Sequence, residues 1–207
     1  MAASGGRRKP YSDDPAIPVL LDVTLPNGYA YRPEIVSSSD ERALVGLFAT
    51  LPFKPFEFHG YLGNRRIVSY GHRYDYSLQA LQVADPMPAW LVPLQRTAED
   101  LLKLRPDSLA QALVTEYAPG AGIGWHRDKP MFEHVVSISF GGPCMLRLRR
   151  RIEGKWLRAK QIIMPRSAYI LSGEARDIWE HSIPPADQLR YSVTFRDFRR
   201  NAAPERP

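Results

Sequence analysis

The sequence predicts a mainly β protein with flanking α-helices, built as a two-sheet jelly roll that N-terminal helices back. Two observations predict this fold. From residue 113 onward, short segments rich in β-forming residues alternate with Gly-containing turns. Before that point, two stretches carry apolar residues at helical spacing. A chain of 207 residues can bury a substantial core, so we expect one structural domain.

We expect four regions along this domain. Residues 1–15 and 199–207 lack apolar periodicity and are predicted to be flexible tails. Residues 16–111 are expected to form an N-terminal region that holds the supporting helices and, at about 53–76, a segment rich in aromatic residues and cations. Residues 112–198 are expected to form the jelly-roll core.

Two helices are predicted in the N-terminal region. Ser38 and Glu41 have the spacing of a capping box, and the helix that they open is expected to end before Pro52. A second helix is predicted at about 89–104, where Pro93 is tolerated only near the first turn. We expect both helices to back a sheet.

Seven strands are predicted in the core because β-branched and aromatic residues recur there between turns. Gly141-Gly142-Pro143 and Glu153-Gly154 are two of these turns. The predicted strands span residues 113–117, 135–140, 145–150, 156–164, 168–171, 179–183 and 190–198.

A metal site is predicted from His126, Asp128 and His181. Two imidazoles and one carboxylate on one face of an Fe(II) ion leave coordination positions for a bidentate 2-oxo acid and O2. A His-x-Asp motif alone also fits a solvated turn with a surface histidine. The Gly-rich approach at 120–124, the distant His181 and the strand that follows it favour the iron site.

The last predicted strand carries polar residues on one face. Side chains alternate along a strand, so Arg190, Ser192, Thr194 and Arg196 share a face. That face fits a solvated surface. After a candidate iron site it also fits a dicarboxylate site, because arginine pairs with carboxylates bidentately and stays charged when buried. We expect Arg190 or Arg196 to bind 2-oxoglutarate.

These motifs resemble the AlkB family of Fe(II)/2-oxoglutarate-dependent nucleic-acid dioxygenases over about residues 30–198. Tyr117-Ala-Pro-Gly precedes His126 by nine residues, His126-x-Asp128 follows, and His181 stands near Ile183-Pro184. Arg190-Tyr-x-x-Thr-Phe-Arg196 completes the pattern. The resemblance implies a double-stranded β-helix, which is a jelly roll.

The resemblance also implies roles for single residues. His126, Asp128 and His181 would bind Fe(II), with 2-oxoglutarate and O2 as cosubstrates. Tyr117 and Arg190 would contact the distal carboxylate of 2-oxoglutarate.

The same resemblance places Arg196 near the metal-side carboxylate and Asp128. Thr115 and Ser192 stand where family members commonly carry asparagine, and both can still donate hydrogen bonds in the 2-oxoglutarate site.

The segment at about 53–76 resembles the nucleotide-recognition lid of the family. Arg65, Arg66, Tyr74 and Tyr76 match its pattern, so the resemblance implies that they bind substrate. Base-repair members place an acidic residue two positions after the metal aspartate, whereas this chain has Pro130. The lid pattern is most like that of the RNA-acting branches.

The resemblance implies that the enzyme oxidatively demethylates or dealkylates N-alkylated bases in DNA or RNA and releases aldehyde, succinate and CO2. The nucleic acid would be single-stranded or present a flipped base. Pro130 favours the alternative of a 2-oxoglutarate oxygenase that hydroxylates a protein or small molecule. A nucleic-acid-binding module with a vestigial iron site would have lost ligands, and the set here is complete.

Several other aromatic side chains and histidines are expected to have roles in packing or at the surface. Phe53 and Phe56 are expected in the core, and Trp125 and Trp179 are expected to pack beside the ligands. The remaining histidines, which are His59, His72 and His134, are expected to be packing or surface residues.

A run of cations flanks the turn Glu153-Gly154 and predicts a basic hairpin. It fits a solvated outer face and also fits a surface that neutralises phosphates. Its cations are Arg147, Arg149, Arg150, Arg151, Lys155, Arg158 and Lys160.

Composition and charge predict where the protein is located and what kind of partner it has. The single Cys144 excludes an internal disulfide, which agrees with a cytoplasmic location. The chain has no apolar run long enough to span a membrane, and we expect no membrane partner and a monomer. The formal net charge of +6 favours a polyanionic partner.

Overall fold

The computed structural model describes residues 25–58, 61–75, 78 and 80–200. The predicted tail at 1–15, most of the predicted tail at 199–207, His59 and Tyr76 lie outside the described residues.

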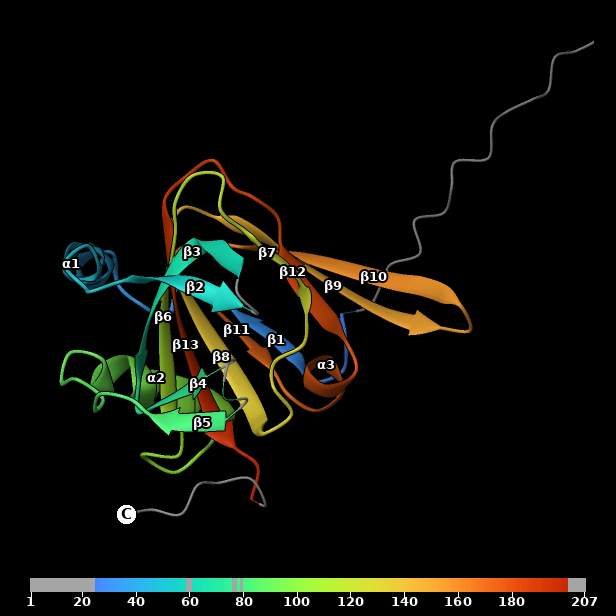
Figure 1. Ribbon diagram of the computed structural model, residues 1–207, viewed down its shortest axis with the longest axis horizontal. Coiled ribbons are helices and arrows are strands. Elements are labelled where there is room, and N and C mark those ends of the chain that lie inside the picture. The colour runs from blue at the N-terminus through green and yellow to red at the C-terminus, as the bar shows by residue number, and fades with distance from the viewer. Residues whose placement is uncertain (1–24, 59–60, 76–77, 79, 201–207) are drawn as a thin grey trace, which may run out of the picture.

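Two antiparallel sheets form the body of the protein, which confirms the predicted jelly roll (Figure 1). The larger sheet has seven strands in the order β1 (Tyr29–Arg32), β11 (Ala168–Leu171), β8 (Phe132–Gly141), β13 (Arg190–Phe198), β6 (Gln111–Tyr117), β3 (Tyr61–Tyr70) and β2 (Lys54–Phe58). The smaller sheet has four strands in the order β10 (Lys155–Ile163), β9 (Cys144–Ile152), β12 (Glu180–Ile183) and β7 (Ile123–His126). A separate pair joins β4 (His72–Asp75) and β5 (Ala80–Val83).

The strands of the core lie where the β-forming segments predict them. Both β11 and β13 have the predicted bounds, whereas β8 begins three residues earlier than predicted, at Phe132, and β6 two residues earlier, at Gln111. The extra residues extend pairing with β13, whose register runs from Arg190 opposite Gly141 to Phe198 opposite Phe132.

Both predicted helices form, but their first residues differ from prediction. Helix α1 spans Ser38–Phe48, and its N-cap is Ser37, whose hydroxyl accepts a hydrogen bond from the Asp40 amide at 3.1 Å. The capping pair is therefore one residue earlier than predicted. Glu41 instead accepts a hydrogen bond from the Gly141 amide at 3.0 Å, which ties α1 to the large sheet.

Helix α2 spans Val92–Leu102, so Pro93 does fall in its first turn. A short third helix, α3, spans Gly173–Asp177. In Figure 1, α1 and α2 lie on the left, away from the β9–β10 hairpin that projects on the right. None of the helices in the described part of the chain is both long and apolar enough to cross a membrane.

Two apolar cores lie on opposite faces of the large sheet. One packs Phe48 of α1 and Ala98 of α2 against Tyr191, Val193 and Phe195, which share one face of β13. Both helices therefore back the sheet, as predicted. The other core lies between the two sheets and contains Leu146, Leu148, Ile163, Leu171 and Trp179. The polar face of β13 turns toward the second core, and this orientation positions the candidate site.

Candidate active site

A cavity of about 1260 Å³ opens between the two sheets. Its lining includes the predicted metal ligands His126, Asp128 and His181, together with Tyr117 and Arg196. Strands β6, β7, β12 and β13 and the loop after β7 supply these five residues. The jelly roll thus brings together residues that are distant in the sequence.

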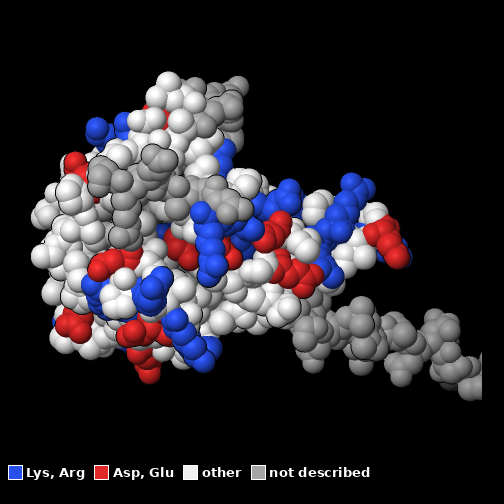
Figure 2. Space-filling view, turned by 90° about the horizontal axis from the view of Figure 1, so that it is seen from below, with Lys and Arg blue, Asp and Glu red and all other residues white. Residues whose placement is uncertain are grey.

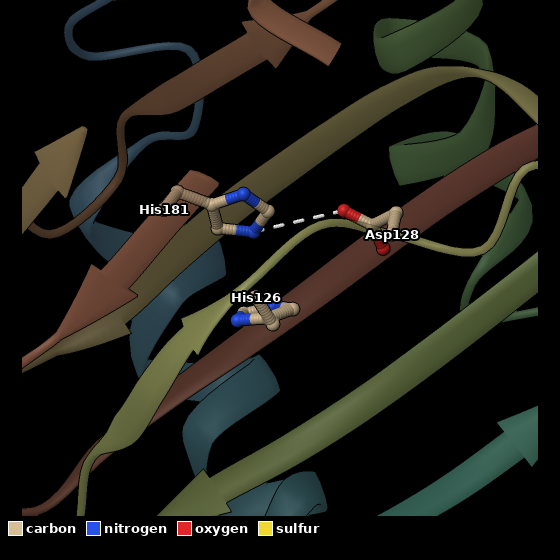
Figure 3. Close-up of side chains that lie close together, drawn as sticks. All are labelled: His126, Asp128 and His181. Atoms are coloured by element: carbon tan, nitrogen blue, oxygen red, sulfur yellow. Dashed lines mark ion pairs between the residues drawn. The ribbon is translucent and has the colours of Figure 1, made fainter. Parts of the chain in front are cut away.

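The three predicted ligands converge (Figure 3). Strand pairing places His181 of β12 directly opposite His126 of β7, and the two ring centroids are 4.2 Å apart. Asp128 follows the end of β7, and one ligand atom from each residue lies within 4.8 Å of the others. Two imidazoles and a carboxylate therefore face one point, which is the donor set of a non-haem iron centre.

Both histidines are suited to metal binding, His126 by a hydrogen bond and both by burial. Nδ1 of His126 lies 2.9 Å from the carbonyl oxygen of Gly124, so Nδ1 donates and Nε2 keeps its lone pair. Burial lowers the pKa of His126. Burial and the neighbouring His126 lower the pKa of His181 to about 3. Both rings are neutral at neutral pH, as a metal ligand must be.

One oxygen of Asp128 is held and the other is free. Arg196 donates to Oδ1 from Nη2 at 2.7 Å and from Nε at 2.9 Å. Burial would raise the pKa of Asp128, but the positive charges around it, of which Arg196 contributes most, together outweigh burial and hold that pKa well below its usual value. Oδ2 is buried, has no hydrogen-bond partner among the described residues, and lies 3.6 Å from Nε2 of His181. A buried carboxylate oxygen without a donor fits a cation at this point.

Arg190 is the cationic counterpart of Asp128, because it too is buried and has side-chain atoms without a partner among the described residues. It is only 1% exposed, and its Nε donates to Ser139 Oγ at 3.1 Å. Nη1 and Nη2 are buried and have no hydrogen-bond partner among the described residues. The guanidinium carbon lies 4.7 Å from the centre of the Tyr117 ring. A buried guanidinium with two free nitrogens fits the carboxylate of a bound dicarboxylic acid.

Thr115 and Ser192 share the strand face that carries Tyr117 and Arg190. They are buried and directly opposite one another across β6 and β13, so their side chains point to the same face. Thr115 lines the cavity. The two arginines therefore differ: the Nη atoms of Arg190 have no hydrogen-bond partner among the described residues, whereas Arg196 is engaged by Asp128.

The structure separates the four residues predicted to bind substrate. Arg65 lines the cavity, with its guanidinium carbon 3.7 Å from the centre of the Phe56 ring. Tyr74 also lines the cavity, and Nζ of Lys129 lies 4.3 Å from the centre of its ring. Tyr76 lies outside the described residues.

Arg66 does not fit the substrate role. Neighbouring residues on a strand point to opposite faces, so Arg66 faces away from the cavity that Arg65 lines. It donates to Glu116 Oε1 from Nε at 2.7 Å and to Oε2 from Nη2 at 2.9 Å. This bidentate pair on the helix side of the sheet occupies the guanidinium.

Three packing expectations need correction. Phe56 lines the cavity under Arg65 and is not part of the core, although Phe53 does pack against the helix-side core. Trp125 lies beneath Arg149 at the cavity rim, whereas Trp179 is buried as predicted. His134 is not a lone packing residue, because its Nδ1 lies 2.7 Å from Oδ2 of Asp197.

Residues that no sequence motif indicates also support the site. Ser139 holds Arg190, and Gln111 accepts a hydrogen bond from Nη1 of Arg196 at 3.2 Å. Arg176 is buried and donates to the carbonyl oxygens of Lys129 and Phe132, which fixes the loop after Asp128. Alternating serines within the apolar run of β8 are a signal that could have identified Ser139, since they mark a polar face inside a core strand.

Comparisons with known proteins agree with this geometry. Residues 49–196 match the model of the 2OG-Fe(II) oxygenase superfamily. The tRNA (carboxymethyluridine(34)-5-O)-methyltransferase ALKBH8 of Mus musculus is 28% identical over 184 residues, which cover 83% of this chain and 27% of that protein. The alkylated DNA repair protein ALKBH8 homolog of Arabidopsis thaliana is 28% identical over 169 residues, which cover 67% of this chain and 48% of that protein.

A viral relative and a solved structure extend these matches. Uncharacterized protein L905 of Acanthamoeba polyphaga mimivirus is 30% identical over 154 residues, which cover 64% of this chain and 70% of that protein. The structure of OsALKBH1 superposes with a TM-score of 0.68 at 15% identity and covers 84% of this chain and 98% of that one, which shows the same fold.

The chain spans only about a quarter of the mouse relative and about half of the Arabidopsis relative. The family match nevertheless covers most of this chain and contains all three candidate ligands. The chain therefore belongs to the 2OG-Fe(II) oxygenase superfamily and, within it, to the AlkB family, and it is a dioxygenase that uses Fe(II), 2-oxoglutarate and O2.

Proposed function

We propose that this enzyme oxidatively demethylates N-alkylated bases of a nucleic acid, in a single strand or as an extruded base. In this proposal His126, Asp128 and His181 hold the Fe(II) ion. Tyr117, Thr115, Arg190 and Ser192 hold the 2-oxoglutarate.

The protein contributes orientation and charge to this reaction. When bound, Fe(II) supplies the oxidising chemistry, in which O2 and 2-oxoglutarate are consumed and a C–H bond of the alkyl group is hydroxylated. The hydrogen bond to Gly124 turns the Nε2 atom of His126 toward the ion. Arg196 fixes Asp128 through Oδ1 so that Oδ2 faces the same point. Arg190 neutralises the distal carboxylate of the cosubstrate and sets which way it lies.

One oxygen atom of O2 enters succinate as 2-oxoglutarate loses CO2, and the other becomes the hydroxyl group on the alkyl carbon. For an N-methyl group the resulting N–CH2OH splits into an N–H group and formaldehyde.

The residues at the rim of the cavity support a nucleic acid as the substrate. Arg65 on Phe56 and Lys129 on Tyr74 place aromatic faces and cations around one opening. Enzymes that act on a base must offset the loss of its stacking, and aromatic faces and phosphate contacts do so. Two relatives are also named for action on tRNA or on alkylated DNA.

Pro130 favours a second candidate function. It lines the cavity two residues after Asp128, where a carboxylate would be needed to contact an amino group of a damaged base. A protein or small-molecule substrate does not need such a carboxylate. This alternative predicts hydroxylation without dependence on oligonucleotides.

Both functions are tested by following succinate formation. The protein is loaded anaerobically with Fe(II) and 2-oxoglutarate, O2 is admitted, and methylated single-stranded RNA, methylated single-stranded DNA or no oligonucleotide is added. We expect oligonucleotide-stimulated succinate and formaldehyde in equal amounts, and neither product from His126→Ala. Uncoupled succinate that no oligonucleotide increases would move the assignment to the alternative.

The two neighbouring arginines of β3 supply a matched pair of variants for the same assay. Arg65→Gln changes the cavity rim, whereas Arg66→Gln removes a cation from the other face. We expect Arg65→Gln to raise the KM for the oligonucleotide and Arg66→Gln to leave it unchanged. Equal effects of the two variants would contradict the assignment of the rim.

A further inference from the structure

We propose that the outer face of the β9–β10 hairpin binds the sugar-phosphate backbone of a single nucleic-acid strand whose base enters the cavity. This inference rests on the proposed function, and it adds a second contact surface beyond the cavity rim. The hairpin is defined by residues 144–163 and projects from the body of the protein (Figure 1).

Strand register places most of the cations of the hairpin on one face. Across β9 and β10, Arg147 is opposite Lys160, Arg149 is opposite Arg158, and Arg151 is opposite Trp156. Directly opposed residues in an antiparallel pair share a face, and so do residues two apart along a strand. The outer face therefore carries five cations and one tryptophan, which are Arg147, Arg149, Arg151, Arg158, Lys160 and Trp156.

Three of the five cations are exposed and have no ion-pair partner among the described residues. Glu180 of the adjoining strand pairs with Arg149 at 2.7 Å, and Arg147 donates to Ser182 at 3.0 Å. Arg151, Arg158 and Lys160 are exposed, and within the ranges that the structure describes none of them forms an ion pair. Like charges directly opposite one another destabilise a sheet, so this face is arranged for an anionic ligand at some cost in stability.

The inner face of the same hairpin carries fewer unpaired cations than the outer face. It carries Leu146 and Leu148, which belong to the core between the sheets, and Arg150, which pairs with Glu174. The remaining cation on that side, Lys155, lies opposite Ile152 at the end of the hairpin. Most of the unpaired positive charge of the hairpin therefore lies on the outer face. Figure 2 shows Lys and Arg side chains gathered along the projecting hairpin.

A stacked row of side chains connects this face to the cavity. The guanidinium carbon of Arg149 lies 4.2 Å from the ring centre of Trp125 and 4.2 Å from that of Trp156. Trp125 also lines the cavity, and Trp156 is 38% exposed. The row therefore begins at the cavity rim and ends at an open indole. A strand leaving the cavity would meet a stacking platform for a base and a row of cations for its phosphates.

The length of the row sets the length of the oligonucleotide needed to reach it. Residues 147 and 151 of one strand are about 13 Å apart at roughly 3.3 Å per residue. A trinucleotide whose central base occupies the cavity is too short to follow this row, whereas a strand of fifteen nucleotides spans it. The proposal therefore predicts a difference between short and long substrates.

The test compares two triple variants that remove the same charge. Arg151→Gln/Arg158→Gln/Lys160→Gln neutralises most of the outer face, and Arg42→Gln/Lys103→Gln/Arg105→Gln neutralises three exposed cations outside the hairpin. Fluorescence anisotropy measures Kd for a methylated 15-nucleotide RNA, its DNA counterpart and the trinucleotide over a range of salt concentrations.

We expect the outer-face triple to weaken binding of the 15-nucleotide strand about tenfold or more and to reduce its salt slope by about 2, since each lost phosphate contact on a single strand contributes about 0.7. The control triple and the trinucleotide should show no such change. The stronger of the RNA and DNA arms identifies the strand that the hairpin binds. Equal losses in both triples, or no loss in the outer-face triple, would overturn the proposal.

Trp156 gives an independent variant. Trp156→Ala should weaken binding of the long strand at all salt concentrations, and Trp156→Phe should restore much of it, because stacking needs an aromatic face and no charge. Thermal unfolding of every variant confirms that it is folded. The hairpin proposal alone is contradicted if the wild-type protein forms succinate with the long strand and the hairpin variants bind that strand normally. Wild-type protein that neither binds nor responds to any oligonucleotide contradicts the proposed function as well.

Discussion

Arg196 and Asp128 form an ion pair in which the guanidinium contacts only Oδ1 of the carboxylate, at 2.7 Å and 2.9 Å. The pair lies on the inner side of the large sheet, where both side chains are largely buried. Because Oδ1 is occupied, the carboxylate has one defined orientation and presents Oδ2 to the two imidazoles. Arg196 is thus a positioning residue for the proposed metal ligand.

Replacement of Arg196 by glutamine should weaken metal binding. Loss of a partner that orients a ligand typically costs about 10- to 100-fold in metal affinity. We expect a rise of that size in the Kd for Mn²⁺, measured by quenching of tryptophan fluorescence. Arg199→Gln is the matched control, because Arg199 lines the same cavity but pairs with Asp177. An unchanged Kd in Arg196→Gln would show that Asp128 is oriented by other contacts.

Replacement of Arg190 by methionine should separate stability from cosubstrate binding. The buried Nη atoms lack partners, so removing the charge should leave the melting temperature of the metal-free protein unchanged or raise it. With Mn²⁺ present and O2 excluded, 2-oxoglutarate at 100 times its Kd should stabilise the wild type by about 2.7 kcal/mol and the variant by almost nothing. A normal 2-oxoglutarate shift in Arg190→Met would refute the assignment.

The ion pair between His134 and Asp197 should make a pH-dependent contribution to stability. The hydrogen bond to Asp197 raises the pKa of His134 above its unfolded value. The contribution is therefore fully present below the unfolded pKa, near 6.5, and is lost as the pH rises through the folded pKa.

The matching variant is His134→Gln. It should lower the free energy of unfolding by about 1 to 2 kcal/mol at pH 5.5 and by less at pH 9, as urea titrations would report. Asp197→Asn should show the same trend, and the double variant should add little to either single variant. A loss that is the same at both pH values would mean that packing, and not the ion pair, is responsible.

The close packing of Gly122 against the neighbouring backbone should affect the metal ligands. A Cβ atom at this position would lie 2.6 Å from the carbonyl oxygen of Ile183, at the β7–β12 pairing that holds His126 against His181. Gly122→Ala should therefore cost about 1 to 3 kcal/mol of stability and weaken Mn²⁺ binding. Gly124→Ala is the control, because nothing lies within 4 Å of its Cβ position and its carbonyl still accepts from His126. Equal behaviour of the two variants would contradict this account.

The core strands were predictable because their residues alternate. Residues 190–198 place Tyr191, Val193 and Phe195 on one face and the arginines on the other, and the structure has β13 with these bounds and faces. The strands β1 to β5 and β7 were not among the predicted strands. They lie at the outer part of a sheet or in a separate pair, where pairing with distant strands decides the structure more than local composition does.

The wrong predictions about side chains of the candidate site also have physical causes. Had residues 61–70 been recognised as a strand, period-two alternation would have separated Arg65 from Arg66. The partner of His134 lies 63 residues away in the sequence, so no local pattern indicates it. The convergence of His126, Asp128 and His181 was expected from a motif, but only the strand register shows which atoms face one another.

The position of β7 has a consequence for local unfolding. It is the last strand of the smaller sheet, it has only four residues, and its pairing with β12 is irregular between His181 and Ile183. A short edge strand of this kind opens at a lower free energy than the sheet interior. Amide hydrogens of β7 should therefore exchange with solvent faster than those of β13 in the metal-free protein. A metal bound by ligands on β12, on β7 and in the loop beyond it would close this edge, so exchange protection of one strand would report occupancy of the whole centre.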